Sequence, residues 1–447
     1  MKPTTQSHRF APSLRPLRQG AAVGYAAVVL ALVSTAGTAT ASDWPQFRGP
    51  GGRGVSDETG LPTQWSETQN LKWRLRLPGQ GSSSPIVHGD QLLVTCYSGY
   101  GAGSNSTDAN ALKRHLLSIV PETGAVRWSR EIPATIPEDP WRGWIREHGY
   151  ASHTPVCDGK HVFVFCGKTG VIAFDTEGQE IWRTNVGTSS GNRQWGSAAS
   201  PILSGNLLFI NASEESRAIY ALDKRTGKEV WKCESYKTEL TYNTPALAEL
   251  PNSRRELVIS VPNEVWGLNP ETGECTWWAK TELRGNVSPS LLAINDVVYV
   301  LGGYPRVASV AIRAGGEGDV TDSHVLWTSR NSSYIPSAVE HEGHLYWVDN
   351  KGAAYCLKAD SGELVYREEL DLGGRNPVYA SASYADGKLY IPSRRQGTLV
   401  LAAKPDFQLL ARNSFEADQS DFNGSAAISG GKLFLRSNKF LYCITNN

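Results

Sequence analysis

One short run holds the residue types of general acid–base catalysis. Arg146, Glu147 and His148 lie side by side within the segment 134–153. Histidine titrates near neutral pH, and a neighbouring carboxylate can orient it or exchange its proton. A lone His beside one Glu is also a common surface ion pair, which contributes little energy. The run is therefore a candidate acid–base cluster, and a surface ion pair is the interpretation we favour.

A second run with chemical potential is EGDVTD, residues 317–322, whose carboxylates suit a hard cation. Calcium loops of the EF-hand type place their oxygen ligands at fixed alternate positions. EGDVTD does not have that spacing. We therefore interpret it as a solvated turn and predict no metal site.

The cysteines could form disulfides, a metal site or a redox pair. They stand at positions 96, 157, 166, 233, 275, 356 and 443, with no CxxC and no adjacent pair. Seven cannot all pair, and several lie in apolar strand-like runs such as VFVFC, where a free thiol acts as a small hydrophobe. The sequence predicts buried free thiols.

The N-terminus has the features of a secretory signal. Arg15 and Arg18 precede an apolar run at 20–33, and small residues up to Ala41 form a cleavage site. The run is shorter than the ~20 residues that a spanning helix requires. We therefore predict that residues 1–41 are a signal peptide, and that the mature chain is periplasmic or secreted with no transmembrane segment.

Charge argues against a nucleic-acid partner. Lys plus Arg and Asp plus Glu number 44 each, and removing the first 41 residues leaves 40 basic against 44 acidic residues. A mildly acidic chain lacks the basic surface that phosphate contacts need. The 14 tryptophans are unusual and indicate one packing role repeated along the chain.

One pattern recurs eight times: a Ser or Thr, then Pro or Ala, then a β-rich hairpin, as in SSPIVHGDQLLVTC. The Pro or Ala stands at Pro85, Pro155, Pro201, Pro245, Pro289, Ala338, Ala382 and Ala426. The successive intervals are 70, 46, 44, 44, 49, 44 and 44 residues. A period in the forties with strand–turn–strand content is typical of propeller blades.

A second pattern follows each hairpin: a short strand, a turn and a Trp, as in ALDKRTGKEVW. It ends at Trp128, Trp182, Trp231, Trp277, Trp327 and Tyr366, and it degenerates in unit seven to AAKPDFQLLA. Each unit is thus four strands, and the indole of the outer strand can wedge between neighbouring blades. The glycine of the turn supplies a positive φ.

The eighth unit lacks an outer strand, and the missing piece lies at the other end of the chain. NLKWRLRLP carries Trp73, which stands 12 residues before Pro85, as Trp277 stands before Pro289. An N-terminal strand that completes the last blade would close the ring and remove an exposed edge. We therefore predict an all-β, eight-bladed β-propeller over residues 70–447, preceded by an extended segment at 42–69.

The AxDxxTGKxxW pattern of ALDKRTGKEVW is the tryptophan-docking motif of propellers of the pyrroloquinoline-quinone (PQQ) type, and its copies cover residues 70–447. With DWPQFRGPGGRG after the cleavage site, the chain resembles exported bacterial PQQ-binding-like β-propeller repeat proteins. That family in turn resembles the propeller lipoprotein of the outer-membrane β-barrel assembly machinery. The chain lacks the adjacent cysteines of PQQ-dependent alcohol dehydrogenases and the lipidated cysteine of the lipoprotein. The resemblance therefore implies the fold and no required cofactor.

The strand order sorts the loops onto two faces. Turns between strands one and two, and between three and four, are short; loops between strands two and three, and those crossing between blades, lie on the other face. That face gathers the candidate binding residues at the channel mouth: Trp141, Arg146, His148, Arg193, Trp195, Glu214, Tyr304, Tyr334, Arg394, Arg395 and Arg436. Trp, Tyr and Arg dominate interface hot spots, although surface loops can also be inert.

These features favour a monomeric, non-catalytic scaffold that binds a protein or peptide partner in the periplasm or at the cell envelope. The alternatives are a PQQ-type quinoprotein oxidoreductase with its site at the channel mouth, and a propeller that binds a small ligand or carbohydrate on its aromatic loops. No catalytic residue and no metal ligand is assigned.

Overall fold

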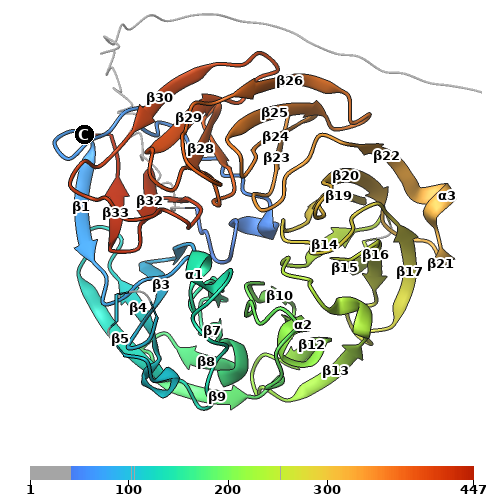
Figure 1. Ribbon diagram of the computed structural model, residues 1–447, viewed down its shortest axis with the longest axis horizontal. Helices are drawn as coiled ribbons and strands as arrows, with labels where there is room; N and C mark the ends of the chain where they lie inside the picture. Colours follow the sequence, from blue (N-terminus) through green and yellow to red (C-terminus); the bar gives the residue numbers. More distant parts are fainter. Residues whose placement is uncertain (1–41, 102, 105, 252, 447) are drawn as a thin grey trace, which may run out of the picture. The chain divides into compact units, whose positions relative to one another are not determined.

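The computed structural model describes residues 42–446 apart from 102, 105 and 252, and the signal peptide predicted at 1–41 lies outside the described residues. Within this part of the chain the strands form eight sheets arranged around a central channel (Figure 1). Neighbouring strands of the repeats are antiparallel. The all-β, eight-bladed propeller is confirmed.

Each blade runs from an inner strand at the channel to an outer strand at the rim. Blades 1–4 comprise β2 (Ile86–His88), β3 (Gln91–Ser98), β4 (Lys113–Ile119), β5 (Val126–Pro133); β6 (Val156–Cys157), β7 (His161–Phe165), β8 (Val171–Asp175), β9 (Glu180–Thr184); β10 (Ile202–Ser204), β11 (Leu207–Ala212), β12 (Ala218–Asp223), β13 (Glu229–Glu234); and β14 (Ala246–Glu249), β15 (Arg255–Val261), β16 (Glu264–Leu268), β17 (Cys275–Lys280). Blades 5–8 comprise β18 (Leu292–Ile294), β19 (Val297–Gly302), β20 (Ala308–Arg313), β22 (Val325–Ser329); β23 (Val339–His341), β24 (His344–Val348), β25 (Ala353–Lys358), β26 (Leu364–Glu369); β27 (Ser383–Ala385), β28 (Lys388–Pro392), β29 (Thr398–Ala402), β30 (Leu409–Asn413); and β31 (Ala427–Ser429), β32 (Lys432–Arg436), β33 (Phe440–Ile444), β1 (Leu71–Arg76).

Burial differs between the middle and the outer strands. Every residue of β11 is buried, whereas β1 alternates between half-buried and exposed side chains. Neighbouring blades cover both faces of a middle strand, so both sets of its alternating side chains are apolar. For this reason the middle strands are continuous hydrophobic runs in the sequence.

A tryptophan of one blade docks on the outer turn of the next. In blade 2, Trp182 Nε1 donates to the Lys224 carbonyl at 3.0 Å, and the ring lies against Gly227. The same arrangement recurs in the pairs Trp73–Gly124, Trp128–Gly178, Trp231–Gly273 and Trp327–Gly362. The docking motif thus joins consecutive blades through an indole–glycine contact and one hydrogen bond.

The junction between blades 4 and 5 departs from this arrangement. Trp277 is fully buried, and its Nε1 donates to Glu256 within its own blade at 2.7 Å. The longer connection of blade 5 adds a short strand, β21 (Gly318–Asp319), parallel to β17, followed by α3 (Thr321–His324). Residues 317–322 were predicted as a solvated turn, and their three acidic residues are exposed, but the backbone forms β21 and the start of α3 instead of a turn.

The ring is closed by the N-terminal strand, as predicted. β1 pairs antiparallel with β33, with Trp73 opposite Cys443 and Leu75 opposite Leu441. The last blade therefore takes its outer strand from the opposite end of the described chain.

Residues 42–58, here called the N-terminal plug, cross the channel. Trp44 exchanges two backbone hydrogen bonds with Val87 of blade 1, and Gly54 and Ser56 bond to Tyr384 of blade 7. Between them lies the short 3₁₀ helix η1 (Pro50–Gly52), seen in blue at the centre of the ring in Figure 1. The plug contacts the turns between first and second strands, so it closes the channel at that end.

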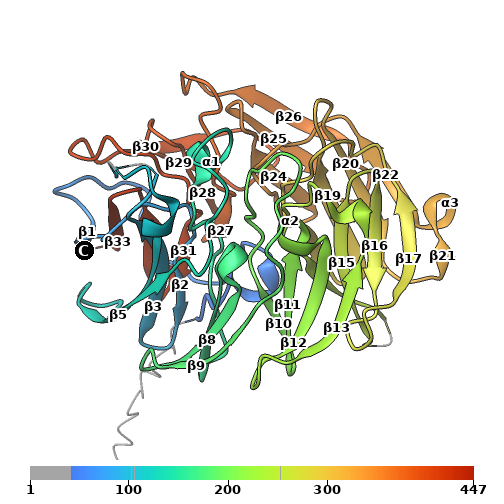
Figure 2. The same ribbon diagram turned by 60° about the horizontal axis from the view of Figure 1, so that its bottom comes forward.

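Two short helices lie near the other end of the blades: α1 (Ile145–His148) and α2 (Ser213–Ser216) (Figure 2). None of the helices in the described residues is long and apolar enough to cross a membrane.

All seven cysteines are free thiols. Five are buried, as predicted, whereas Cys233 and Cys275 are half-buried because they stand on the outer strands β13 and β17.

Candidate functional site

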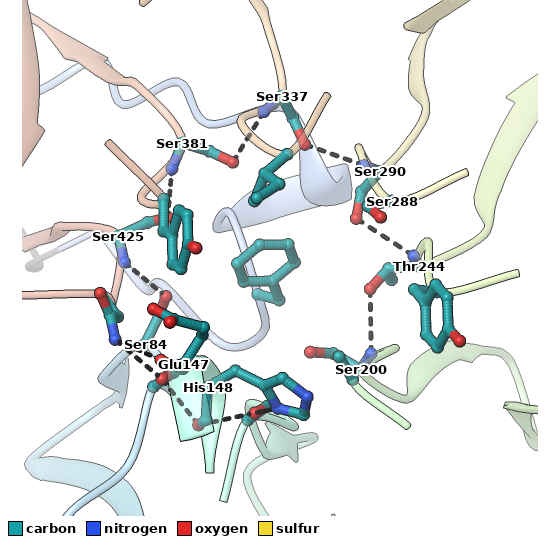
Figure 3. Close-up of a pocket in the computed structure, with 18 of the residues that line it drawn as sticks. Ser84, Glu147, His148, Ser200, Thr244, Ser288, Ser290, Ser337, Ser381 and Ser425 are labelled. Atoms are coloured by element: carbon teal, nitrogen blue, oxygen red, sulfur yellow. Dashed lines mark hydrogen bonds between the residues drawn. The ribbon is translucent and has the colours of Figure 1, made fainter. Parts of the chain in front are cut away.

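A closed circle of hydrogen bonds joins the eight blades around the channel. Immediately before each inner strand, a backbone N–H donates to the hydroxyl oxygen of the equivalent residue in the next blade, at 2.9–3.1 Å. The residues of this hydroxyl ring are Ser84, Thr154, Ser200, Thr244, Ser290, Ser337, Ser381 and Ser425. All of them except Thr154 are labelled in Figure 3. The ring satisfies eight backbone donors that would otherwise be left unpaired.

Each ring hydroxyl keeps a proton to donate. A serine or threonine hydroxyl is one donor and two acceptor positions, and the N–H of the preceding blade uses one acceptor. Among the described residues no ring hydroxyl donates to a protein group. The ring residues other than Thr154 line the cavity at the centre of the propeller, where their hydroxyls are available as donors.

The equivalence of the repeats needs one correction. The ring member of blade 5 is Ser290, two residues before the strand that begins at Leu292, and it is not Ser288, which precedes Pro289. The sequence SPS contains two serines, and Pro289 was aligned with the prolines of the first four units, which selected the wrong serine. In this blade Leu291 therefore stands at the position that Pro or Ala occupies in the other seven.

Above the ring lies a blind cavity, here called the channel pocket, with a volume of about 180 Å³. Phe47 of the N-terminal plug forms its floor, because the plug closes the opposite end of the channel. A second layer comes from the residues two positions before each ring residue, including Tyr242, Tyr379 and Asn423. The pocket thus opens only toward the face with the longer loops.

Aromatic side chains form the upper wall of the channel pocket. Trp144, from the long loop between blades 1 and 2, has its ring 6.0 Å from Trp195, 6.1 Å from Tyr334 and 6.5 Å from Tyr379. Trp195 in turn lies 6.3 Å from Tyr242. The 134–153 loop therefore reaches across the mouth to loops on the opposite side of the ring.

An ion pair fastens this loop. Glu147 Oε2 lies 2.8 Å from Arg394 Nη1, and the Arg394 guanidinium stacks 4.5 Å from the centre of the Tyr379 ring. Arg394 also pairs with Asp421 at 2.7 Å. Its charge is thus neutralised within the protein.

His148 is held by hydrogen bonds at both ring nitrogens. Nε2 lies 2.9 Å from the Trp195 carbonyl and Nδ1 lies 2.7 Å from the Ser152 hydroxyl. A carbonyl only accepts, so Nε2 carries the proton. Burial lowers the pKa of His148 from its ordinary value, which favours the neutral ring. The His148 ring therefore positions the loop and has no nitrogen free for proton transfer.

Glu214 was predicted at the channel mouth, and the structure places it in the interior. Glu214 and Glu215, both on α2, are 2% and 3% exposed. Burial raises the pKa of Glu214 to about 7 and that of Glu215 to about 8. Glu215 accepts a hydrogen bond from Ser197, whose oxygen lies 3.0 Å from His153 Nε2. This buried polar cluster lies behind the pocket wall.

Arg436 also lies in the interior, with 1% exposure. Its Nη1 donates to the Thr95 carbonyl at 2.8 Å and to the Ser83 hydroxyl at 3.2 Å. Arg436 thereby joins blade 8 to blade 1, and no partner could reach it without unfolding this seam.

The other predicted residues divide between the pocket and its surroundings. His148, Trp195 and Tyr334 line the channel pocket. Tyr304 is 55% exposed, and its ring is tilted against that of Tyr334 with the centres 5.3 Å apart; Arg193 lies 5.6 Å from the Trp195 ring.

Trp141, Arg146 and Arg395 do not line the pocket and contact other residues. Trp141 packs against Tyr97 and Tyr150 at 6.1 and 5.7 Å. Arg146 is exposed and donates to the Trp141 carbonyl, and exposed Arg395 pairs with Asp421 at 2.5 Å.

Sequence reasoning missed Trp144, Tyr242, Tyr379 and the hydroxyl ring as pocket residues. The signal was present in the repeat itself: the Ser or Thr recurs in each unit, and Tyr242 and Tyr379 stand two residues before it. Trp144 has no such signal, because its loop belongs to one blade alone.

The lining does not fit PQQ, a polyanionic quinone that binds together with a metal cation. Among the described residues that line the channel pocket there is no Lys or Arg, and Glu147 is the one carboxylate. No group of three or more His, Cys, Asp or Glu side chains in the described chain is placed to hold a metal. We therefore derive no step through this cofactor.

The fold and its repeats define the class: an eight-bladed β-propeller of PQQ-like repeats. Residues 112–323 match a family model described as outer membrane protein assembly factor BamB. A crystal structure of BamB from Moraxella catarrhalis has a TM-score of 0.60, with 12% identity over 84% of this chain and 97% of that one. This likeness shows the shared propeller fold.

Two dehydrogenases are also similar. A europium-containing methanol dehydrogenase has a TM-score of 0.64, with 10% identity over 90% of this chain and 98% of that one. A polyvinylalcohol dehydrogenase from Pseudomonas sp is 24% identical over 341 residues, which cover 68% of this chain and 47% of that protein. The chain spans about half the length of this curated relative.

Proposed function

We propose that this protein is a non-catalytic binding protein that holds a neutral, hydroxyl-bearing ligand, such as a sugar unit or part of a polyol chain, in the channel pocket. The observation that carries the proposal is that one pocket combines a ring of hydroxyl groups at its base with aromatic side chains above them. Aromatic faces pack against C–H surfaces, while hydroxyls exchange hydrogen bonds with ligand oxygens. A mostly apolar pocket with a few convergent polar groups is typical of small-molecule sites.

The charge of the lining supports a neutral ligand. The lone carboxylate, Glu147, is paired with Arg394 at 2.8 Å, and the neutral His148 adds no charge. A charged ligand would lose its hydration and gain no opposite charge in return. A polyhydroxylated ligand would replace water hydrogen bonds with those of the ring.

The names of two similar proteins agree with this ligand class, since polyvinyl alcohol and methanol are neutral alcohols. The residues of the pocket favour binding of the ligand without its oxidation. The ring nitrogens of His148 are both engaged, and the lining offers no cation for an anionic quinone.

Calorimetry tests the proposal. Purified protein is titrated with neutral di- and oligosaccharides, with short polyvinyl alcohol, and with a uronic acid oligomer as the charged counterpart. We expect millimolar or tighter binding of a neutral ligand, weakened at least tenfold by Trp144→Ala. Tyr236→Ala, which truncates an aromatic side chain that is 76% exposed outside the pocket, is the matched control. Equal binding by Trp144→Ala and wild type would exclude the channel pocket as the site.

Titration with PQQ and calcium in the same experiment separates the oxidoreductase alternative. Heat release with PQQ that is lost in Trp144→Ala would contradict the non-catalytic proposal.

A second candidate is a protein or peptide scaffold that acts as a monomer outside the cytoplasm. A groove of about 920 Å³ over blade 5 supports it, because Arg284, Arg306 and Arg330 line this groove, are exposed and form no ion pair among the described residues. Glu282 is the one acidic residue of its lining. Unpaired guanidinium groups beside the exposed Tyr304 match the composition of interface hot spots.

A cross-linking pull-down from an envelope extract tests this candidate. Arg306→Glu combined with Arg330→Glu should remove the captured partner at low salt. Arg225→Glu, on a short turn of the opposite face and paired only with Asp223, should leave capture unchanged. Equal capture by both variants would contradict a role for the groove.

A further inference from the structure

The carboxylate of Glu58 receives hydrogen bonds from three backbone N–H groups. Gly430 and Gly431, in the turn between β31 and β32, donate to Oε1 at 2.6 Å and to Oε2 at 2.5 Å. The third donor is the backbone nitrogen of Ser42, which lies 3.2 Å from Oε1. Glu58 thus ties both ends of the N-terminal plug to blade 8.

The neighbouring residue fixes the position of Ser42. Asp43 Oδ1 accepts from the Gly89 N–H at 2.7 Å, and Asp43 Oδ2 lies 2.7 Å from His88 Nδ1. Trp44 follows and is fully buried. The nitrogen of Ser42 is therefore held in place by two anchored residues directly after it.

Glu58 lacks a cationic partner. No Lys, Arg or His side chain of the described chain forms an ion pair with its carboxylate, although it is half-buried. A peptide N–H offers the carboxylate a hydrogen bond alone, whereas an ammonium group adds the attraction between opposite charges in contact. An ammonium group at the position of the Ser42 nitrogen would complete this site, whereas a peptide N–H completes it only in part.

We propose that the chain is hydrolysed between Ala41 and Ser42, and that the α-ammonium group of Ser42 then binds the Glu58 carboxylate and locks the N-terminal plug in the channel. A peptidase of the class that cuts after small residues adds water across the peptide bond. The products are a carboxylate on Ala41 and an ammonium group on Ser42. The small residues before the bond and the carboxylate after it are two independent features that meet at one peptide bond.

The lock has a consequence for the channel pocket. Phe47, which forms the pocket floor, stands five residues after Ser42, between the attachment to blade 1 and the attachment to blade 7. Cleavage would therefore stabilise the plug that closes the channel. This inference does not depend on which ligand the pocket takes.

The test measures the pKa of the α-amino group directly. Three chains are prepared: one that begins at Ser42, the same chain with Glu58→Gln, and one that begins at Ala41. The rate of N-terminal acylation is followed against pH by mass spectrometry of the N-terminal peptide. An ordinary α-amino group has a pKa of roughly 7.7–8.0, and an opposite charge in contact raises it by about one unit or more.

We expect acylation of the Ser42 chain at neutral pH to be roughly tenfold slower than in Glu58→Gln, as a shift of one unit requires. Asp386→Asn is the matched control, because Asp386 binds Gly60 on the same face and does not touch Ser42. Equal rates in the Ser42 chain and in Glu58→Gln would overturn the lock. A mature exported protein whose mass places its first residue elsewhere than Ser42 would overturn the cleavage site.

Discussion

Gly227 of blade 3 lies directly against the indole of Trp182 in blade 2. A β-carbon at position 227 would come 2.4 Å from Cε3 of that ring, which is closer than two carbon atoms can approach. The backbone at Gly227 also has a φ of +70°. The glycine of the docking motif is therefore required twice, once by the turn and once by the neighbouring blade.

A pair of glycine substitutions separates these two requirements. Gly227→Ala and Gly205→Ala both place a side chain at positive φ, but nothing lies within 4 Å of a β-carbon at Gly205. In both variants the left-handed backbone lowers the free energy of unfolding by about 1–2 kcal/mol. We expect Gly227→Ala to cost about 1–3 kcal/mol more, since the indole must move. Urea unfolding measures both, and equal losses would show that the contact carries no energy.

The hydroxyl ring predicts unequal effects for two serines of the same channel. Ser200→Ala removes the acceptor of the Thr154 N–H and leaves that donor buried, which costs about 1–3 kcal/mol. Ser288 lines the same pocket but accepts no hydrogen bond from the described chain. Ser288→Ala should therefore lower the free energy of unfolding by less than about 0.5 kcal/mol. Thermal unfolding of the two variants provides the comparison. A loss in Ser288→Ala as large as in Ser200→Ala would refute the ring's structural role.

Ring closure predicts that the N-terminal strand carries much of the stability. Deleting residues 70–78 removes β1 and exposes the edge of β33, so we expect the cooperative unfolding transition to broaden and move to lower temperature. Near-wild-type thermal stability in this deletion would contradict closure.

A milder change in the same strand is Trp73→Ala. It removes an indole packed 6.1 Å from Phe434 and bonded to the Pro121 carbonyl, at a cost of about 3–5 kcal/mol. Tyr236→Ala, at an exposed aromatic residue, should cost less than about 0.5 kcal/mol in the same unfolding experiment.

The buried carboxyls of α2 predict that stability falls as the pH rises. Burial raises the pKa of Glu214 to about 7 and of Glu215 to about 8, from 4.5 in the unfolded chain. Between pH 4.5 and these raised pKa values the folded protein therefore binds more protons than the unfolded chain. The free energy of unfolding accordingly falls as the pH increases up to about 8. Each excess proton contributes a slope of about 1.4 kcal/mol per pH unit.

The informative range is about pH 7–8.5. Burial lowers the pKa of His148 and His153 in the folded protein, so both are neutral there. In the unfolded chain both are largely neutral above pH 7, because the ordinary pKa of histidine is about 6.5. Denaturant unfolding at several pH values should give a falling curve for wild type and a flatter one for Glu215→Gln. Glu122→Gln, at a surface acid, should follow wild type, and an unchanged slope in Glu215→Gln would show that this carboxyl is already ionised.

Part of the site was visible in the sequence. The recurring Ser or Thr was part of the repeat, and strand order placed Trp195, Tyr334 and His148 near the channel mouth. The repeat could not show that these hydroxyls form a circle, because their partners are one blade away. It also misplaced blade 5 by two residues, since local sequence offers two serines around Pro289.

Glu214 and Arg436 show the limit of loop assignment. Both were predicted in loops of one face, yet Glu214 lies in α2 and Arg436 ends β32, and they are 2% and 1% exposed. A residue at the end of a blade is buried when a neighbouring segment lies over it, and the sequence around that residue does not contain this information. Gly191, in the loop between blades 2 and 3, covers Glu214 closely.

The sequence by itself determined the repeat, the number of blades, the docking tryptophans and the strand that closes the ring. Each of these follows from local periodicity, in which side-chain spacing reports strand, turn and blade. Only the tertiary structure decided that the N-terminal plug closes one end of the channel, that eight hydroxyls meet at its centre, and that Trp144 reaches the far wall. Those contacts join segments distant in sequence, and they arise only after the blades have closed into a ring and fixed where each chain segment can lie.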